Sequence, residues 1–334
     1  MLYKKLSLFI YALALVILLS GCAKKLPTLT ALSTKQLTQE LVLQAQLSKS
    51  NAHAYVLTEG PQFNRWDIAS GEVIQSIDRE LLPQNTRSFV ISENESQFVT
   101  SDGKSLSLWE LDSFRIIGSL DFRQQLGDAS IYSVVFIDDS VLAVGNSDGS
   151  IIFADLVNSV FRKRYAHSNE VVRLSVGHQK KYLYSAGNDG KVITTDLQEL
   201  LTKNEYKTPF RVTSMISNSD DSLIFISDAL DQQVIWQPWQ NRVVARLDYW
   251  QQYRFFRRGM FIADDTLLLT TSPKTGISVW NTTTGKEVAN WTAVSQSLGS
   301  TVMDIQELSG NQIMTITSDS VIETWDLSAL LSLQ

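Results

Sequence analysis

The chain has 334 residues and a formal net charge of −6, with 44% hydrophobic and 19% charged residues. The hydrophobic content is too high for a disordered chain, and the acidic balance argues against a general nucleic-acid-binding protein, which needs surplus Lys and Arg to neutralise phosphates. One Cys allows no internal disulfide, and three His at positions 53, 167 and 178 show no metal-ligand spacing. We therefore expect neither a metal nor a cofactor.

The N-terminal segment has the pattern of an export signal. Two Lys within residues 1–5 precede an apolar run over 6–19, which is too short for a comfortable membrane span. The run ends in Leu19-Ser20-Gly21-Cys22, which resembles the lipobox of bacterial lipoproteins. The resemblance implies that residues 1–21 are a signal peptide, that Cys22 carries palmitate-type acyl chains, and that residues 22–40 form a lipidated tether. Ala23 follows the Cys instead of Asp, which implies the outer membrane.

The remainder of the chain carries a repeat with a period of 41 to 45 residues. In each period a β-rich run leads to a turn that often contains Asp-Gly. A second β-rich run then ends in a recurring pair of residues, an aromatic or small residue followed by a polar one. Asp-Gly favours tight turns between antiparallel strands, so each period predicts four short strands. The seven pairs are Trp66-Asp67, Trp109-Glu110, Ala154-Asp155, Thr195-Asp196, Trp236-Gln237, Trp280-Asn281 and Trp325-Asp326.

This repeat resembles that of the WD-repeat β-propeller family. The resemblance implies an all-β fold, a seven-bladed β-propeller of four-stranded antiparallel blades over residues 41–334. The fourth repeat matches best, and the resemblance implies a hydrogen-bonded chain of His167, Ser185 and Asp189 within its blade. Thr195 stands where the family has Trp, and five other repeats place a structural Trp there: Trp66, Trp109, Trp236, Trp280 and Trp325.

How the ring closes is left open by the sequence. The outer strand of the last blade is either 330–333 at the C-terminus or 28–32 near the N-terminus. Residues 41–47 align with the inner strand of the first blade. Residues 33–36 also resemble a capping box that would begin a helix there, but we prefer the strand.

The segment from Asp248 to Arg258 is the most unusual stretch of the chain, with five aromatic residues and three Arg among 11 residues. This composition is typical of protein-interaction hot spots. On a propeller the segment links the fifth blade to the sixth, and the two Phe have the alternative role of filling the blade interface. We expect replacement of the three Arg to leave stability nearly unchanged. The candidate partner-binding residues here are Tyr253, Arg254, Phe255, Phe256, Arg257 and Arg258.

Two weaker candidates lie elsewhere. Arg87, Arg173 and Arg211 stand near the starts of other predicted inner strands, so they form a candidate basic rim around one mouth of the central channel, suited to an acidic protein segment or a polyanion. Trp239, in an unusual Gln-Pro-Trp turn, is a candidate contact on the opposite face. Paired Asp residues at 138–139, 220–221 and 264–265 fit solvated turns better than Ca²⁺ sites.

These observations predict a non-enzymatic, lipid-anchored scaffold that faces the periplasm from the bacterial outer membrane. It would bind envelope proteins through propeller loops, and neither nucleic acid nor metal. Two alternatives stay open. Residues 280–291 also resemble the repeat of quinoprotein-type propellers, including the accessory lipoprotein of the outer-membrane β-barrel assembly machinery, although that subunit has eight blades. A propeller enzyme would need convergent Asp, Glu and His side chains in the central channel.

Overall fold

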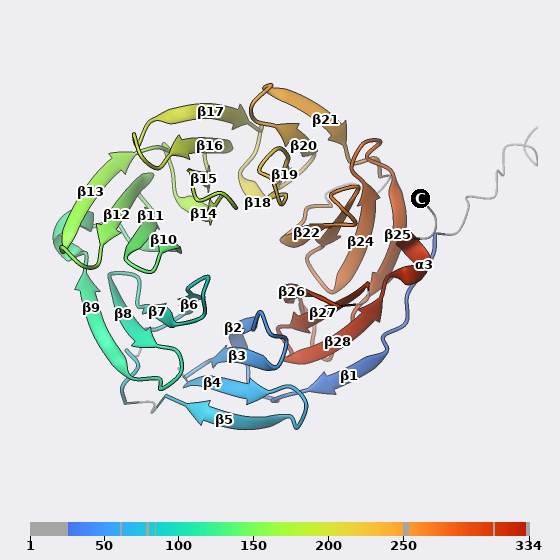
Figure 1. The fold of residues 1–334 in the computed structure, drawn as a ribbon, viewed down its shortest axis with the longest axis horizontal. Coiled ribbons are helices and arrows are strands. Elements are labelled where there is room, and N and C mark those ends of the chain that lie inside the picture. The colour runs from blue at the N-terminus through green and yellow to red at the C-terminus, as the bar shows by residue number, and fades with distance from the viewer. Residues whose placement is uncertain are drawn as a thin grey trace, which may run out of the picture.

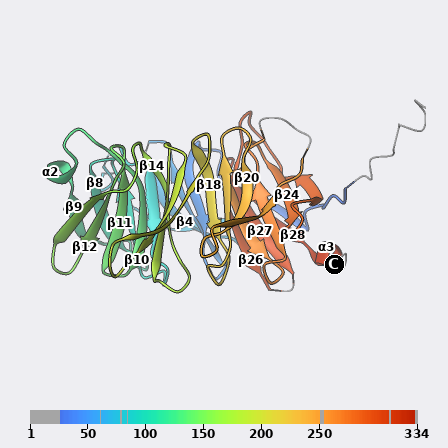
Figure 2. The same ribbon diagram turned by 90° about the horizontal axis from the view of Figure 1, so that it is seen from above.

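The seven blades predicted from the repeat are present in the structure. The computed structural model describes residues 26–60, 62–77, 80–83, 85–249, 254–309 and 311–331. Seven four-stranded antiparallel sheets surround a central channel (Figure 1) and form a flat disc when viewed from the edge (Figure 2). The predicted signal peptide and Cys22 lie outside the described residues.

Each of the first six blades is a run of four consecutive strands, named here from the inner strand to the outer one. Blade one has β2 (Val42–Leu47), β3 (His53–Thr58), β4 (Gln62–Asp67) and β5 (Glu72–Ser76). Blade two has β6 (Ser88–Ile91), β7 (Gln97–Ser101), β8 (Ser105–Glu110) and β9 (Ile116–Asp121), followed by the short helix α2 (Arg123–Leu126). Blade three has β10 (Ile131–Asp138), β11 (Val141–Asn146), β12 (Ser150–Asp155) and β13 (Val160–Tyr165).

Blades four to six continue the pattern around the ring. Blade four has β14 (Val171–Val176), β15 (Tyr182–Gly187), β16 (Lys191–Asp196) and β17 (Thr202–Lys207). Blade five has β18 (Val212–Ser217), β19 (Ile224–Asp228), β20 (Gln233–Gln237) and β21 (Arg242–Arg246). Blade six has β22 (Arg258–Ile262), β23 (Leu267–Thr271), β24 (Gly276–Asn281) and β25 (Glu287–Thr292). The repeated residue pairs all fall at the end of the third strand of their blade.

The last blade closes the ring with a strand from the N-terminal part of the chain. It consists of β26 (Val302–Leu308), β27 (Gln312–Thr317), β28 (Val321–Asp326) and the outer strand β1 (Ser33–Gln36), which pairs antiparallel with β28. The Lys35 ammonium also donates to the carbonyls of Ile68 and Ala69 at 3.1 and 2.6 Å, so β1 joins blade seven to blade one.

This closure decides between the alternatives that the sequence left open. The closing strand lies at 33–36, slightly beyond the expected 28–32, and it forms no helix, so part of the expected tether belongs to the propeller. Near the C-terminus, the alternative outer strand is instead the helix α3 (Ser328–Leu331). In the described part of the chain, no helix is both long and apolar enough to cross a membrane.

Five of the seven blades have a tryptophan near the end of the third strand, and most of these residues are buried. Trp109, Trp280 and Trp325 are fully or almost fully buried. Their indole N–H groups donate to threonine hydroxyls on the second strand, to Thr100 at 3.0 Å, Thr270 at 2.8 Å and Thr315 at 3.1 Å. A buried indole combines a large apolar area with one donor that needs a partner, and this pairing satisfies it. Trp236 is equally buried but donates to the Asn241 side chain at 3.3 Å, and Trp66 is half-buried.

The hydrophobic core lies between blades as much as within them. Phe63 of blade one stacks on Phe98 of blade two with ring centroids 4.7 Å apart, and Phe89 meets Phe63 edge-on at 4.9 Å. Because both faces of a blade pack against neighbours, its middle strands are apolar in sequence instead of alternating. In β15, for example, five of six residues are buried.

Blade four contains the hydrogen-bonded chain expected from the resemblance. The two ring nitrogens of His167 lie 3.0 Å from the Asp189 carboxylate and 2.9 Å from the Ser185 hydroxyl. The same carboxylate accepts backbone N–H groups of Ser168 and Lys191 at 3.0 and 3.1 Å. Burial acts to raise the pKa of Asp189, but the hydrogen bonds from His167 and the two N–H groups outweigh it and lower the pKa to about 2.

Replacing Asp189 with alanine is expected to lower the free energy of unfolding by about 2 kcal/mol at neutral pH, because hydrogen bonds to a charged group are lost. The folded pKa lies below the ordinary value of 3.8, so the carboxylate stabilises the fold above about pH 4 and this contribution disappears as the pH falls towards 2. Urea unfolding at pH 7 and pH 3 measures the effect. A difference between wild type and D189A that did not shrink at the lower pH would contradict it.

Candidate partner-binding site at the channel mouth

Arg254 is held inside the protein, although the sequence made it a candidate contact residue. Its guanidinium donates to both carboxylate oxygens of Glu287, at 2.8 and 3.2 Å, and to the Ser278 hydroxyl. The side chains of Arg254 and Glu287 are only 15% and 13% exposed. Arg254 therefore joins the loop before β22 to the outer part of blade six.

Three aromatic rings surround the same guanidinium. Its central carbon lies 5.0 Å from the ring centroid of Trp280, 5.4 Å from Phe256 and 5.6 Å from Tyr249, within the range of cation–π attraction. Phe256 is fully buried and packs edge-on against Trp280 and Phe225. Phe256 thus has the alternative role expected for it, filling the blade interface, and the Arg254 guanidinium is already bound within blade six.

The other members of the segment differ in position. Phe255 is partly exposed and borders a surface hollow of about 570 Å³ beside Pro273 and Trp291. Tyr253 lies outside the described residues. Arg257 and Arg258 are exposed at the start of β22, where the Arg257 backbone N–H donates to the Thr271 carbonyl at 2.9 Å. Of the candidate residues of this segment that the structure describes, these two arginines are the exposed ones, and Phe255 is partly exposed.

Arg173 of β14 lies within electrostatic range of this pair. It is partly buried, and its burial, followed by the charges of Arg258 and Arg257, lowers its pKa to about 10. Among the described residues, no carboxylate lies within 4.0 Å of the Arg173, Arg257 or Arg258 guanidinium. The structure therefore brings together three like charges from blades four and six. Arg87 and Arg211, the other expected members of a basic rim, are exposed just before β6 and β18.

A cavity of about 220 Å³ opens at this place, between inner strands of five blades. Gln44 and Ser133 in its wall tie neighbouring inner strands together. The Gln44 amide exchanges hydrogen bonds with the Phe89 backbone at 2.8 and 3.1 Å, and the Ser133 hydroxyl donates to the Val171 carbonyl at 2.7 Å. The side chains with polar groups in the lining are Gln44, Ser88, Ser101, Tyr132, Ser133, Arg173 and Arg258. Catalysis in the channel calls for convergent Asp, Glu and His, whereas this lining supplies cationic and neutral donors.

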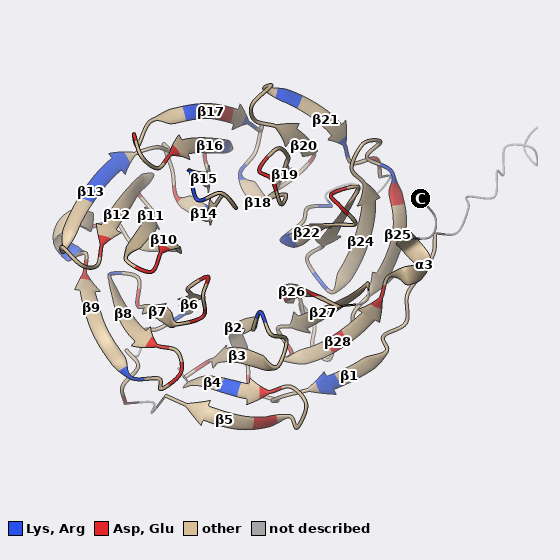
Figure 3. Ribbon diagram, viewed as in Figure 1, with Lys and Arg blue, Asp and Glu red and all other residues tan. Residues whose placement is uncertain are grey.

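Around the other mouth, the loops after the inner strands of blades one and four carry Lys, whereas those of blades two, three, five and six are acidic (Figure 3). Their carboxylates accept hydrogen bonds from the loop of the preceding blade: Asp139 from Asn94 at 2.6 Å, and Asp265 from Asn218 at 2.9 Å. Glu95 accepts likewise from the Lys49 N–H at 2.7 Å. These carboxylates therefore join the loops of neighbouring blades, a role that the Asp pairs in the sequence did not predict. No group of three His, Cys, Asp or Glu suited to a metal occurs in the described ranges.

Trp239 lies on the same side. It is 40% exposed, donates its indole N–H to the Asp221 carbonyl at 3.0 Å and packs against Tyr182 with ring centroids 4.6 Å apart. The indole of Trp239 is thus held in place on one side and exposed to solvent on the other, so its exposed side is free to contact a partner.

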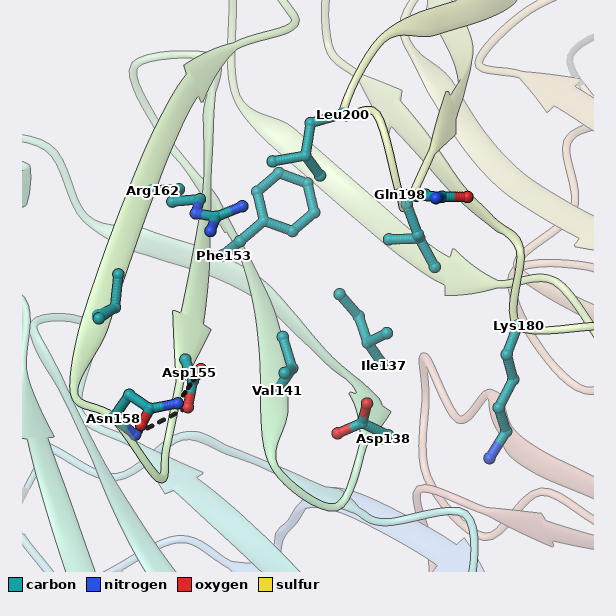
Figure 4. A pocket seen from close by; sticks show the side chains of 12 residues that line it. Ile137, Asp138, Val141, Phe153, Asp155, Asn158, Arg162, Lys180, Gln198 and Leu200 are labelled. Atoms are coloured by element: carbon teal, nitrogen blue, oxygen red, sulfur yellow. Dashed lines mark hydrogen bonds between the residues drawn. The ribbon is translucent and has the colours of Figure 1, made fainter.

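A second hollow, between blades three and four, was not anticipated. It has a volume of about 570 Å³, and Figure 4 shows Ile137 and Phe153 of blade three facing Leu200 of blade four across it, with Arg162 and Lys180 at its edge. Its residues are far apart in the sequence, so no local motif marks it. Lys180 is already paired with Glu93 at 2.7 Å.

Comparison with known proteins gives short, partial matches. The chain is 52% identical to pre-mRNA-processing factor 17 of Homo sapiens and of Mus musculus over 48 residues, which is 14% of this chain and 8% of each relative. It is 28% identical to U3 small nucleolar RNA-associated protein 21 of Saccharomyces cerevisiae over 114 residues, 30% of this chain and 12% of the yeast protein. No protein-family model matches. The chain thus spans a small fraction of these relatives, and the matches together with the seven blades fit a WD-repeat propeller.

Proposed function

We propose that this chain is a non-enzymatic interaction scaffold of the bacterial envelope, anchored by lipid at Cys22 and facing the periplasm from the outer membrane. The lipobox-like tetrapeptide at 19–22 supports the anchor, and the WD-repeat propeller supports protein partners. Seven blades favour this reading over the eight-bladed accessory lipoprotein. The first strand of the propeller begins at Ser33, 11 positions after Cys22 in the sequence.

The observation that carries the proposal is the exposed arginine pair Arg257 and Arg258 at the channel mouth, next to Arg173. Planar guanidiniums are enriched at protein interfaces because each can make several directed hydrogen bonds. Their charges are not used by ion pairs with any described residue, so they are available for a partner.

Replacing Cys22 with serine is expected to move the protein from the outer-membrane fraction to the soluble periplasmic fraction, because serine provides no thiol for the diacylglycerol. Membrane fractionation followed by immunoblotting measures this. Ser20→Ala keeps a small residue in the tetrapeptide and serves as the control that stays with the membrane. Sedimentation of the Cys22→Ser variant with the outer membrane would overturn the anchor.

In-cell crosslinking and affinity capture test the scaffold itself. Wild type is expected to capture a defined envelope protein that the double variant R257Q/R258Q loses. The control R115Q/R162Q removes two exposed arginines from the outer part of the disc and should keep the partner. Equal capture by all three proteins would show that the channel mouth is not the contact face.

A further inference from the structure

We infer that the channel mouth binds an acidic peptide segment, with carboxylates held between Arg173 and Arg258. This inference rests on the proposed scaffold function and specifies the chemistry of the partner. A carboxylate has two acceptor oxygens that match the fork of a guanidinium, so two arginines facing one cavity suit adjacent acidic side chains.

The donors around the cavity are available for such a ligand. Within the described residues, the Arg173 guanidinium makes one hydrogen bond, from Nη1 to the neighbouring Val172 carbonyl at 3.0 Å. Tyr132 is 55% exposed, and its hydroxyl, like that of Ser88, meets no partner in the described part of the chain. Two cationic and two neutral donors thus face one space of about 220 Å³. Gln44 and Ser133 hold the wall rigid by bonding neighbouring inner strands.

The charge pattern favours a short acidic segment over a long polyanion. The guanidiniums of this mouth stand near the starts of the inner strands, while the loops at the opposite mouth carry Asp138, Asp139, Asp264 and Asp265, and the two Lys that pair with Glu93 there are Lys49 and Lys180. The chain as a whole has a net charge of −6. A nucleic acid would extend beyond the arginines and meet acidic surface, which costs free energy. A few adjacent Glu or Asp side chains would remain within the basic mouth.

The carboxylate of Asp304 in β26 offsets part of this positive charge. Its carboxylate accepts the Leu47 N–H at 2.8 Å, and it lies within electrostatic range of Arg258 without forming an ion pair within 4.0 Å. One carboxylate near Arg258 does not balance the charges of Arg173, Arg257 and Arg258, so an excess of positive charge remains at the mouth. An acidic ligand would neutralise that excess.

The test uses the full chain in a neutral detergent and a fluorescein-labelled hexaglutamate peptide, with binding followed by fluorescence anisotropy. The variant R173Q/R258Q is expected to weaken binding about tenfold or more, as loss of charge-assisted hydrogen bonds predicts. R115Q/R162Q, which removes the same charge from the outer part of the disc, should change it less than about twofold. Urea unfolding of both variants confirms that the fold is kept.

Three results would overturn the inference. These are equal weakening by the two double variants, equal binding of a hexaglutamine peptide, and binding of a single-stranded oligonucleotide but not of hexaglutamate. The scaffold function is judged separately, because capture of an envelope protein that depends on Arg257 and Arg258 would persist if only the acidic-peptide chemistry were wrong.

Discussion

Replacing Arg254 with alanine is expected to lower the free energy of unfolding by about 3 kcal/mol, the range for breaking a largely buried ion pair. The substitution leaves the Glu287 carboxylate with little solvent and no cation, and it removes the guanidinium from the cage of Tyr249, Phe256 and Trp280. This replaces the earlier expectation that all three arginines of the segment can be removed at little cost.

Urea unfolding at neutral pH measures the effect, and three further variants identify its cause. Exposed Arg257→Ala is the matched control, with an expected change below about 0.5 kcal/mol. R254K keeps the charge but not the planar fork and should recover only part of the loss. The double variant R254M/E287M removes both charges and should be more stable than R254M alone. An R254A protein as stable as wild type would show that the pair contributes nothing.

The propeller could be predicted from sequence because its signals are local and repeated. Asp148-Gly149 and Asp189-Gly190 turn the chain at equivalent places, and positive φ angles of 80° and 79° at the two glycines explain why Gly is used there. The Trp near the end of the third strand marks the same point in five of the seven blades. Such signals lie within one blade and recur along the chain, so a single sequence is enough to reveal them.

The candidate site was predictable only in part, because its contacts join distant residues. Arg254 and Glu287 are 33 positions apart, and nothing in either neighbourhood marks them as partners. Arginine beside aromatic residues has the same composition on an interface as in a buried cation–π cage, so composition could not separate Arg254 from Arg257 and Arg258. The grouping of Arg173 with Arg258 likewise depends on the channel that brings blades four and six together.

The last prediction concerns Asp304, a partly buried residue of β26 near the channel. Burial raises its pKa to about 6, although the Leu47 N–H and the charge of Arg258 act in the opposite direction. Because this pKa lies above the ordinary value of 3.8, the neutral acid fits the fold better than the carboxylate. The contribution of Asp304 to stability is therefore fully present below about pH 4 and is lost as the pH rises through 6.

Asparagine at position 304 keeps an oxygen for the Leu47 N–H but has no charge to bury. D304N is expected to exceed wild type in the free energy of unfolding by about 2–3 kcal/mol at pH 7.5, and by much less at pH 4.5, because one pKa unit corresponds to about 1.4 kcal/mol. Urea unfolding at the two pH values measures this, and an equal difference at both would contradict it. Since the substitution also removes the carboxylate near Arg258, D304N should bind hexaglutamate more tightly at pH 7.5. A variant that is more stable and binds more tightly would mean that Asp304 restrains the positive charge of the channel mouth at the expense of stability.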